Sequence, residues 1–148
     1  QSLINPYTGI VSLFARLARS GRSIPVYEDG QIVRDFVFID DVASAIVAGV
    51  LRSPAAVEPY DIGLGERTTI MQVAQTIAER YGAPAPHVTG QFRDGDVRAA
   101  WADTTRARQA LDWEPRVSVS EGINRLCDWI DAQEETVPTT PTDTATEV

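Results

Sequence analysis

The chain has 148 residues, 43% of them hydrophobic, so it can bury a single core. Its net charge of -8 argues against nucleic acid as a partner, because that ligand needs clustered cations. No run approaches the ~20 apolar residues of a membrane span and no secretion signal is visible, so we expect a cytoplasmic protein without membrane contact. A single cysteine and a single histidine predict neither a disulfide nor a metal site.

The first part of the chain is predicted to be a helix followed by two strands. Apolar residues recur at helical spacing over residues 7–19, and Gly21 is a typical helix terminator. Residues 24–27 form a short predicted strand, which the turn E-D-G joins to a second predicted strand over residues 33–39. The second strand is rich in β-branched and aromatic residues, so we expect it to be buried.

The charges of this second strand have both a structural and a functional interpretation. Arg34 lies near the start of this strand. A cation at such a position has either a bound ligand or a protein partner, and the candidate partners are Asp35 and Asp40. Asp40 or Asp41 is also well placed to cap the next helix. That helix is predicted to carry an apolar stripe made of Val42, Ala45, Ile46, Gly49 and Val50.

The second part of the chain is predicted to contain one more strand and three helices. Residues 60–62 resemble a buried strand, and Thr69 is placed to cap a helix that ends at Gly82. A short helix is predicted over residues 103–111, and Ser118 begins a capping box that opens the last helix. The inward residues of that last helix are Ile123, Leu126, Cys127 and Ile130. Strands separated by helices indicate an α/β fold.

Five motifs follow one another along residues 1–133. They are Q-S-L-I-N-P-Y-T-G, then I-P-V-Y-E-D-G with R-D-F-V-F-I-D-D-V-A, then Y-D-I-G-L-G-E, R-D-G-D, and W-A-D-T-T-R-A-R-Q-A-L-D-W-E-P. In this order the motifs resemble the substrate-binding portion of extended short-chain dehydrogenases that act on nucleotide sugars, the NAD-dependent epimerase/dehydratase family. The resemblance implies that residues 1–135 are a substrate-binding C-terminal part, in which residues 36–62 complete the sheet of an upstream Rossmann domain. Residues 136–148 are rich in threonine and proline, which predicts a disordered tail.

Two signatures of that family are absent from the sequence. The family binds NAD through a Gly-rich turn, and it uses a Tyr-x-x-x-Lys pair in which the ammonium lowers the pKa of the tyrosine. The chain has no such turn, and all thirteen of its basic residues are arginine. We therefore expect no catalytic or cofactor-binding residue in this chain, with the NAD-binding and catalytic half upstream of Gln1. NAD would be bound by the full-length protein, which the resemblance implies is a homodimer, but not by this chain alone.

The resemblance also implies which residues bind a nucleoside diphosphate sugar. Arg34 and Arg93 correspond to diphosphate contacts, for which the planar guanidinium fork suits phosphate oxygens. Asp96 corresponds to an acceptor for the ribose hydroxyls, and Gly95 lets the tight R-D-G-D loop aim both charges at one ligand. Taken alone, R-D-G-D would be a common surface turn.

The other expected contacts lie near the base and the sugar. Val26 and Tyr27 correspond to the base pocket of the family, and Glu28 stands where many relatives have glycine. Thr8 belongs to a loop that enters the first helix, and a helix N-terminus favours an anion. These residues complete the predicted substrate site.

The resemblance implies one of two related reactions. N-P-Y-T-G followed by V-Y-E-D-G favours a 4-epimerase acting on a dTDP- or UDP-hexose, and a 4,6-dehydratase remains open. Both reactions proceed through a 4-keto hexose, and the residues that separate them are expected upstream. Two alternatives are a non-catalytic nucleotide-sugar-binding module and a structural protein that kept the fold and lost the ligand.

Overall fold

A computed structural model describes residues 9–53 and 59–135. Helices and short strands are mixed along the chain, which confirms the expected mixed α/β class. In chain order they are α1 (Ile10–Arg19), β1 (Pro25–Val26), β2 (Val33–Arg34), α2 (Ile39–Arg52), β3 (Thr68–Thr69), α3 (Ile70–Tyr81), β4 (His87–Val88), α4 (Thr105–Leu111) and α5 (Val119–Glu135). Thr8 and the predicted tail over residues 136–148 lie outside the described residues.

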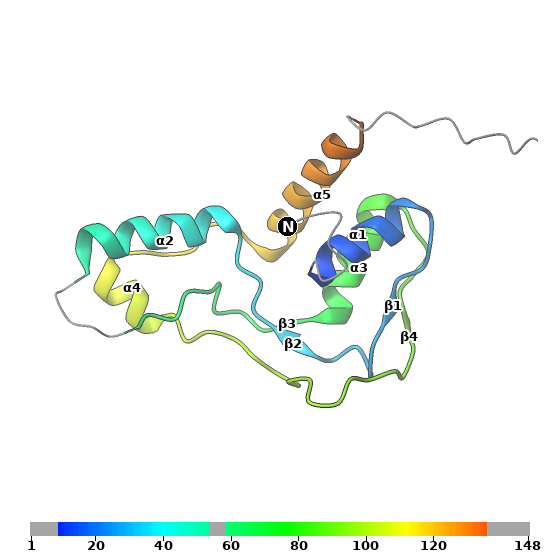
Figure 1. Cartoon of the computed structure of the whole chain (residues 1–148), viewed down its shortest axis with the longest axis horizontal. Helices are drawn as coiled ribbons and strands as arrows, with labels where there is room; N and C mark the ends of the chain where they lie inside the picture. Colours follow the sequence, from blue (N-terminus) through cyan, green and yellow to red (C-terminus); the bar gives the residue numbers. More distant parts are fainter. Residues whose placement is uncertain (1–8, 54–58, 136–148) are drawn as a thin grey trace, which may run out of the picture.

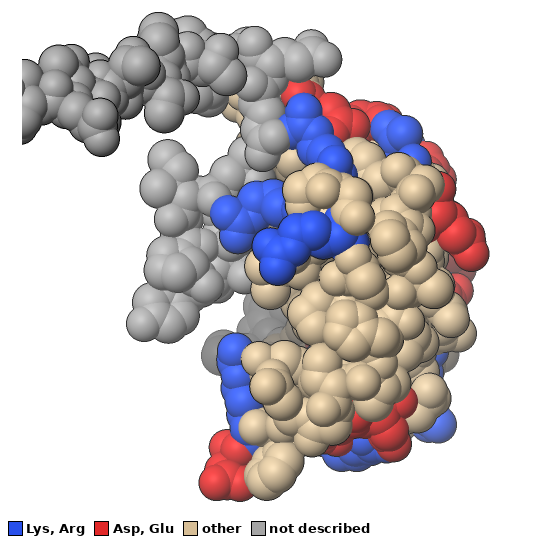
Figure 2. Space-filling model, turned by 90° about the vertical axis from the view of Figure 1, so that its right-hand side faces the viewer, with Lys and Arg blue, Asp and Glu red and all other residues tan. Residues whose placement is uncertain are grey.

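The helices gather into two groups, with β2 and β3 between them and β1 and β4 on the outer side of the group that contains α1 and α3 (Figure 1). The larger group contains α1, α3 and α5, which share one apolar core, and the smaller group pairs α2 with α4. Viewed from the end that carries α1 and α3, the molecule presents a broad uncharged surface with side chains of both signs around its margin (Figure 2). None of the helices within the described ranges is long and apolar enough to cross a membrane.

Helix α3 forms as its sequence predicts. The Thr69 hydroxyl accepts a hydrogen bond from the Gln72 backbone N–H at 3.1 Å, and the Gln72 side chain accepts one from the Thr69 backbone N–H at 2.8 Å. Gly82 ends the helix at φ +61°, a left-handed conformation that suits glycine. The apolar face of α3, which includes the fully buried Val73 and Ile77, forms the centre of the larger core.

The flanking helices also follow their local signals. Backbone hydrogen bonds at Gly21 and Arg22 close α1 against Ala18 and Leu17, so the predicted terminator is confirmed. The Ser118 hydroxyl accepts a hydrogen bond from the Glu121 N–H at the start of α5, at 3.3 Å. Further along α5, the inward-facing Cys127 is fully buried, and burial raises the pKa of its thiol.

The strands are shorter than predicted. β1 pairs with β4 in parallel, with Pro25 opposite His87, and β2 pairs with β3 antiparallel. The strand predicted over residues 33–39 is correct only for its first two residues, which are half-buried, and the strand predicted over residues 60–62 is not formed. A strand needs a partner, and no segment within residues 9–53 and 59–135 pairs with residues 35–38 or 60–62.

The predicted cap of α2 is wrong, for a reason that lies far along the chain. The helix begins after Phe38 without a side-chain cap. The buried carboxylate of Asp41 instead accepts hydrogen bonds from the backbone N–H groups of Arg116 and Val117, both at 3.0 Å. Two donors from another loop thus compete successfully with the helix N-terminus for this carboxylate.

The predicted apolar stripe of α2 is only partly covered. Ala45 and Ala48 pack against α4, whereas the larger side chains point away from it. The exposed fractions are 68% for Ile39, 63% for Ile46, 57% for Val47, 81% for Val50 and 75% for Leu51. A helix face of this size and apolar character is rarely left in water.

Replacing Asp41 tests the long-range tether. Asp41→Ala leaves two backbone N–H groups without their acceptor, so we expect it to lower the free energy of unfolding of the chain by about 2 kcal/mol in urea denaturation. Asp40→Ala is the matched control, because the Asp40 side chain is 72% exposed and its ion pair with Arg125 is long, at 3.8 Å. We expect that control to change stability by less than about 0.5 kcal/mol. Equal unfolding midpoints for the two variants would contradict this role of Asp41.

Candidate functional site

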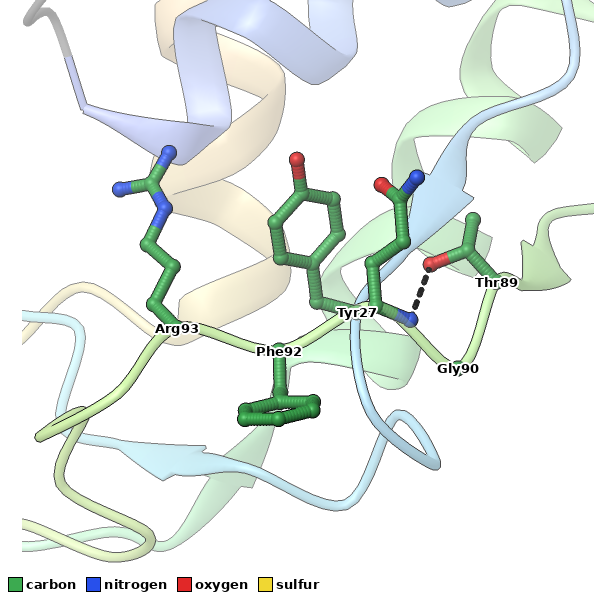
Figure 3. Close-up of a pocket in the computed structure, with 6 residues that line it drawn as sticks. Tyr27, Thr89, Gly90, Phe92 and Arg93 are labelled. Atoms are coloured by element: carbon green, nitrogen blue, oxygen red, sulfur yellow. Dashed lines mark hydrogen bonds between the residues drawn. The ribbon is translucent and has the colours of Figure 1, made fainter.

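An open hollow of about 480 Å³ lies where the chain leaves β1 and β4. Its lining residues are Tyr27, Thr89, Gly90, Gln91, Phe92 and Arg93 (Figure 3). The Tyr27 and Arg93 side chains extend toward the same side, with the guanidinium carbon of Arg93 5.8 Å from the ring centroid, whereas the Phe92 ring points to the opposite side. The hollow therefore offers an aromatic wall and a cation, which suits a planar ring attached to an anion.

Main-chain pairing holds the wall of this hollow in place. The register of β1 and β4 continues beyond both strands, with Thr89 N–H donating to the Val26 carbonyl at 2.9 Å and Glu28 N–H donating to the Gln91 carbonyl at 2.7 Å. The Thr89 hydroxyl donates to the same Val26 carbonyl at 3.2 Å. The Val26 side chain is buried in the core and does not line the hollow, so any role of Val26 in binding would be that of its backbone.

The structure brings the predicted Arg34 and Asp96 together, although 62 residues separate them. Nη2 of Arg34 lies 3.4 Å from Oδ1 of Asp96, and Nη1 of Arg34 donates to the Val33 carbonyl at 2.8 Å. The partners considered for Arg34 from sequence, Asp35 and Asp40, are not the ones it pairs with. Both members of the Arg34–Asp96 pair remain partly exposed, so a ligand can reach them.

The loop from Arg93 to Asp96 connects the ion pair to the hollow. Asp96 N–H donates to the Arg93 carbonyl at 3.2 Å, which closes the R-D-G-D segment into a turn. Arg93 lines the hollow beside Tyr27, and Asp96 contacts Arg34 on β2. Of the six predicted substrate contacts, this arrangement connects Tyr27, Arg93, Asp96 and Arg34.

Asp35, which the sequence suggested only as an ion partner of Arg34, organises the neighbouring turn. Asp35 accepts backbone hydrogen bonds from Leu64 at 2.8 Å, Gly65 at 2.9 Å and Ala102 at 3.2 Å. Gly63 is required beside it, because a Cβ atom there would lie 2.5 Å from Oδ2 of Asp35. The signal available in the sequence was a lone acid within an apolar run, followed later by a turn with two glycines.

Arg98 is a second residue that sequence reasoning missed. Its guanidinium contacts Glu28 Oε2 at 2.6 Å and both carboxylate oxygens of Asp29, at 2.7 and 2.6 Å. Glu28 has φ +51°, a left-handed conformation that explains why glycine suits this position. Hydrogen bonds from Arg98 and from the Gln31 N–H hold the pKa of Asp29 well below its usual range.

No group of three or more metal-ligating side chains occurs among the described residues. The Nδ1 atom of His87 lies 2.7 Å from the Ser23 hydroxyl, so this ring already has a polar partner. The donors and acceptors of the site are therefore those of the arginines, the acidic residues and the aromatic hollow.

Comparisons with known proteins identify the family of this chain. A family model described as GDP-mannose 4,6 dehydratase matches residues 5–126. The dTDP-L-rhamnose 4-epimerase of Burkholderia thailandensis is 55% identical over 134 residues, which are 90% of this chain and 37% of that protein. The UDP-glucose 4-epimerase of Thermotoga maritima, solved with UDP-glucose, superposes with a TM-score of 0.78 at 32% identity, covering 88% of this chain and 42% of that one.

A third comparison extends the similarity to a dehydratase. The dTDP-glucose 4,6-dehydratase of Bacillus anthracis, solved in complex with NAD, superposes with a TM-score of 0.75 at 27% identity, covering 89% of this chain and 43% of that one. The chain belongs to the family of nucleotide-sugar epimerases and dehydratases among the extended short-chain dehydrogenases. It matches their C-terminal portion and spans less than half the length of these relatives.

The Arg98 contact predicts a specific titration behaviour. Because the pKa of Asp29 is lowered in the folded chain, the stabilisation is present above the ordinary value of about 3.9 and is lost as the pH falls through the folded value. Arg98→Gln should return the Asp29 pKa most of the way to the ordinary value, as followed by NMR of the side-chain carboxyl. Arg22→Gln, in an exposed turn before β1, should leave it unchanged. An unaltered Asp29 titration in Arg98→Gln would show that another group lowers this pKa.

Proposed function

We propose that this chain is the nucleotide-sugar-binding part of an NAD-dependent sugar-nucleotide epimerase acting on a dTDP- or UDP-hexose. The carrying observation is the continuous arrangement of Tyr27, Arg93, Asp96 and Arg34, which offers an aromatic wall, two cations and an acceptor in one stretch. The similarity to a dTDP-L-rhamnose 4-epimerase favours 4-epimerisation over 4,6-dehydration. The proposed residues divide the ligand between them, with Tyr27 beside the base, Asp96 at the ribose and the two arginines at the diphosphate.

The Arg34–Asp96 contact supports this division of roles. Without a ligand, Asp96 partly neutralises Arg34 across 3.4 Å, a long and partly solvated ion pair. A diphosphate offers Arg34 a stronger, bidentate acceptor, and its arrival frees the Asp96 carboxylate for the ribose hydroxyls. One exchange of partners would thus prepare two contacts for the same ligand. Thr8, which precedes α1, remains a proposed contact outside the described residues.

We propose that the reaction itself needs an upstream dinucleotide-binding half. NAD would accept a hydride from C4 of the hexose and return it, so that the sugar passes through a 4-keto form. The chain has no lysine and no Gly-rich dinucleotide turn, so residues 1–135 would bind, orient and cover the substrate, followed by the tail over residues 136–148. The exposed apolar face of α2 fits packing against that upstream half. The full-length protein would be a cytoplasmic homodimer.

The first test concerns the cofactor. We expect that the 148-residue chain alone shows no saturable NAD binding in calorimetry and no epimerase or dehydratase turnover, because it lacks both family signatures. The full-length protein should bind NAD and turn over the sugar nucleotide. Micromolar NAD binding by the chain alone would refute this assignment, and a full-length protein that binds the sugar nucleotide without NAD would favour a non-catalytic binding module.

The second test concerns the two cations. Each of Arg34→Ala and Arg93→Ala in the full-length protein removes a charge-assisted contact worth roughly 1.5 to 3 kcal/mol, so the affinity for UDP or dTDP should fall about ten- to more than a hundredfold. Affinity for the sugar nucleotide should fall nearly as much, since both ligands share the diphosphate. Calorimetry provides the measurement.

The control for both variants is Arg22→Ala, because Arg22 is exposed and precedes β1, whereas Tyr27 follows it. The surface arginine Arg80, near the end of α3, is unsuitable as a control because it pairs with Asp128 and Asp131 on α5. If both site variants stay within twofold of the unmodified protein, Arg34 and Arg93 are structural and the assigned site is wrong.

A further inference from the structure

The main chain of Arg98 belongs to the charged end of the proposed site. Its carbonyl accepts a hydrogen bond from Val33 N–H at 3.0 Å, beside Arg34 on β2. Asp96, the ion partner of Arg34, lies two residues before Arg98 in the chain. The division of roles above gives Arg98 no part in binding, although its backbone is fixed by the segments that carry this ion pair.

The Arg98 side chain extends to the turn that follows Tyr27. Nη1 donates to Glu28 Oε2 at 2.6 Å and to Asp29 Oδ1 at 2.7 Å, and Nη2 donates to Asp29 Oδ2 at 2.6 Å. A hydrogen bond from Gly30 N–H to the Tyr27 carbonyl, at 3.1 Å, closes the turn. The Arg98 side chain is 52% exposed, but a bidentate pair with a carboxylate keeps its strength in such a position, so Arg98 anchors this turn.

The turn needs an anchor because of the backbone of Glu28. This residue has φ +51°, a left-handed conformation that side chains of its kind rarely adopt and that glycine adopts readily. Its N–H donates to the Gln91 carbonyl at 2.7 Å, one of the hydrogen bonds that hold the wall of the hollow. If Glu28 relaxed to a negative φ, the chain would change direction immediately after Tyr27 and this hydrogen bond would break. Arg98 opposes the relaxation because it holds the Glu28 side chain and the carboxylate that follows it.

We propose that Arg98 is the positioning residue of the aromatic wall, and that it fixes the Tyr27 ring relative to the diphosphate-binding arginines. The Tyr27 ring and the Arg93 side chain extend toward the same side of the hollow (Figure 3). This inference rests on the proposed nucleotide-sugar site and adds the residue that aligns its base end with its charged end. Arg98 acts through Glu28 and Asp29 and not on the ligand, so its loss weakens the contacts to the nucleoside and spares those to the diphosphate.

The first experiment compares UDP with inorganic pyrophosphate, which has no nucleoside, in calorimetry on the full-length protein. Arg98→Gln should lower the ratio of UDP to pyrophosphate affinity about fivefold or more, the lower end of what a lost base–aromatic stacking contact costs. This ratio largely cancels the removed positive charge, because both ligands carry the diphosphate. Arg22→Gln removes the same charge at an exposed position before β1 and should leave the ratio within about twofold.

The second experiment separates the positioning of Tyr27 from a general effect on the fold. In a Tyr27→Ala background, Arg98→Gln should lower the ratio by less than about twofold, because the ring that Arg98 positions is gone. A merely structural role would add its full loss in this background. Adding Glu28→Gly to Arg98→Gln should restore the ratio to within about twofold of the unmodified protein, since glycine adopts the left-handed conformation without an anchor.

Three results would overturn the role of Arg98. They are an unchanged ratio in Arg98→Gln, the same loss with and without the Tyr27 ring, and no recovery when Glu28→Gly is added. Each of them leaves the proposed diphosphate site intact as long as Arg34→Ala and Arg93→Ala still weaken binding of both probes. A full-length protein that binds neither UDP nor pyrophosphate overturns the proposed function, and the role of Arg98 with it.

Discussion

The carboxylate of Asp35 is the contact on which the arrangement of the site depends. It accepts hydrogen bonds from the backbone N–H groups of Leu64, Gly65 and Ala102, and thereby extends the contacts that β2 makes with β3 and that Val33 makes with Ala99. Because Arg34 directly precedes Asp35, these hydrogen bonds also fix the position of the Arg34 backbone. Neighbouring residues of an extended segment point to opposite sides, so the Arg34 side chain is directed away from Asp35. Asp41 repeats the device six residues later with Arg116 and Val117. Two acids of one motif thus hold loops, whereas the arginine beside Asp35 makes its ion pair with Asp96 at 3.4 Å.

The ion pairs around the site differ in how readily a ligand can replace them. Arg98 donates hydrogen bonds to Asp29 through two nitrogens, and one of these nitrogens also donates to Glu28. This bidentate geometry restrains the turn after Tyr27. Arg34 contacts Asp96 through one nitrogen at 3.4 Å, a distance at which an exposed pair contributes little. The first pair therefore restrains the turn beside the hollow, whereas the second is the pair that we propose a diphosphate would replace.

The sequence predicted the parts of this structure whose signals are local. Thr69 and Gly82 bound α3 because a cap and a terminator act within a few residues of themselves. The strand over residues 33–39 was predicted too long because a strand depends on a distant partner. The predicted cap at Asp41 was wrong because backbone donors 75 and 76 residues away bind its carboxylate. The family motifs identified Arg34 and Asp96 but gave no indication of their contact. Arg98 was missed because both of its partners lie about seventy residues away.

The segment that carries Arg34 also leads into the exposed face of α2, and this connects binding to assembly. Residues 35–38 have a strand-like composition but no strand partner among the described residues, and α2 follows with Ile46, Val50 and Leu51 largely in water. Docking of the proposed upstream half would cover α2 and would give residues 35–38 a neighbouring strand. Ordering those residues would hold Arg34 more firmly, because its backbone is continuous with theirs. We therefore expect the arginine site to reach its full affinity only when the apolar face of α2 is covered.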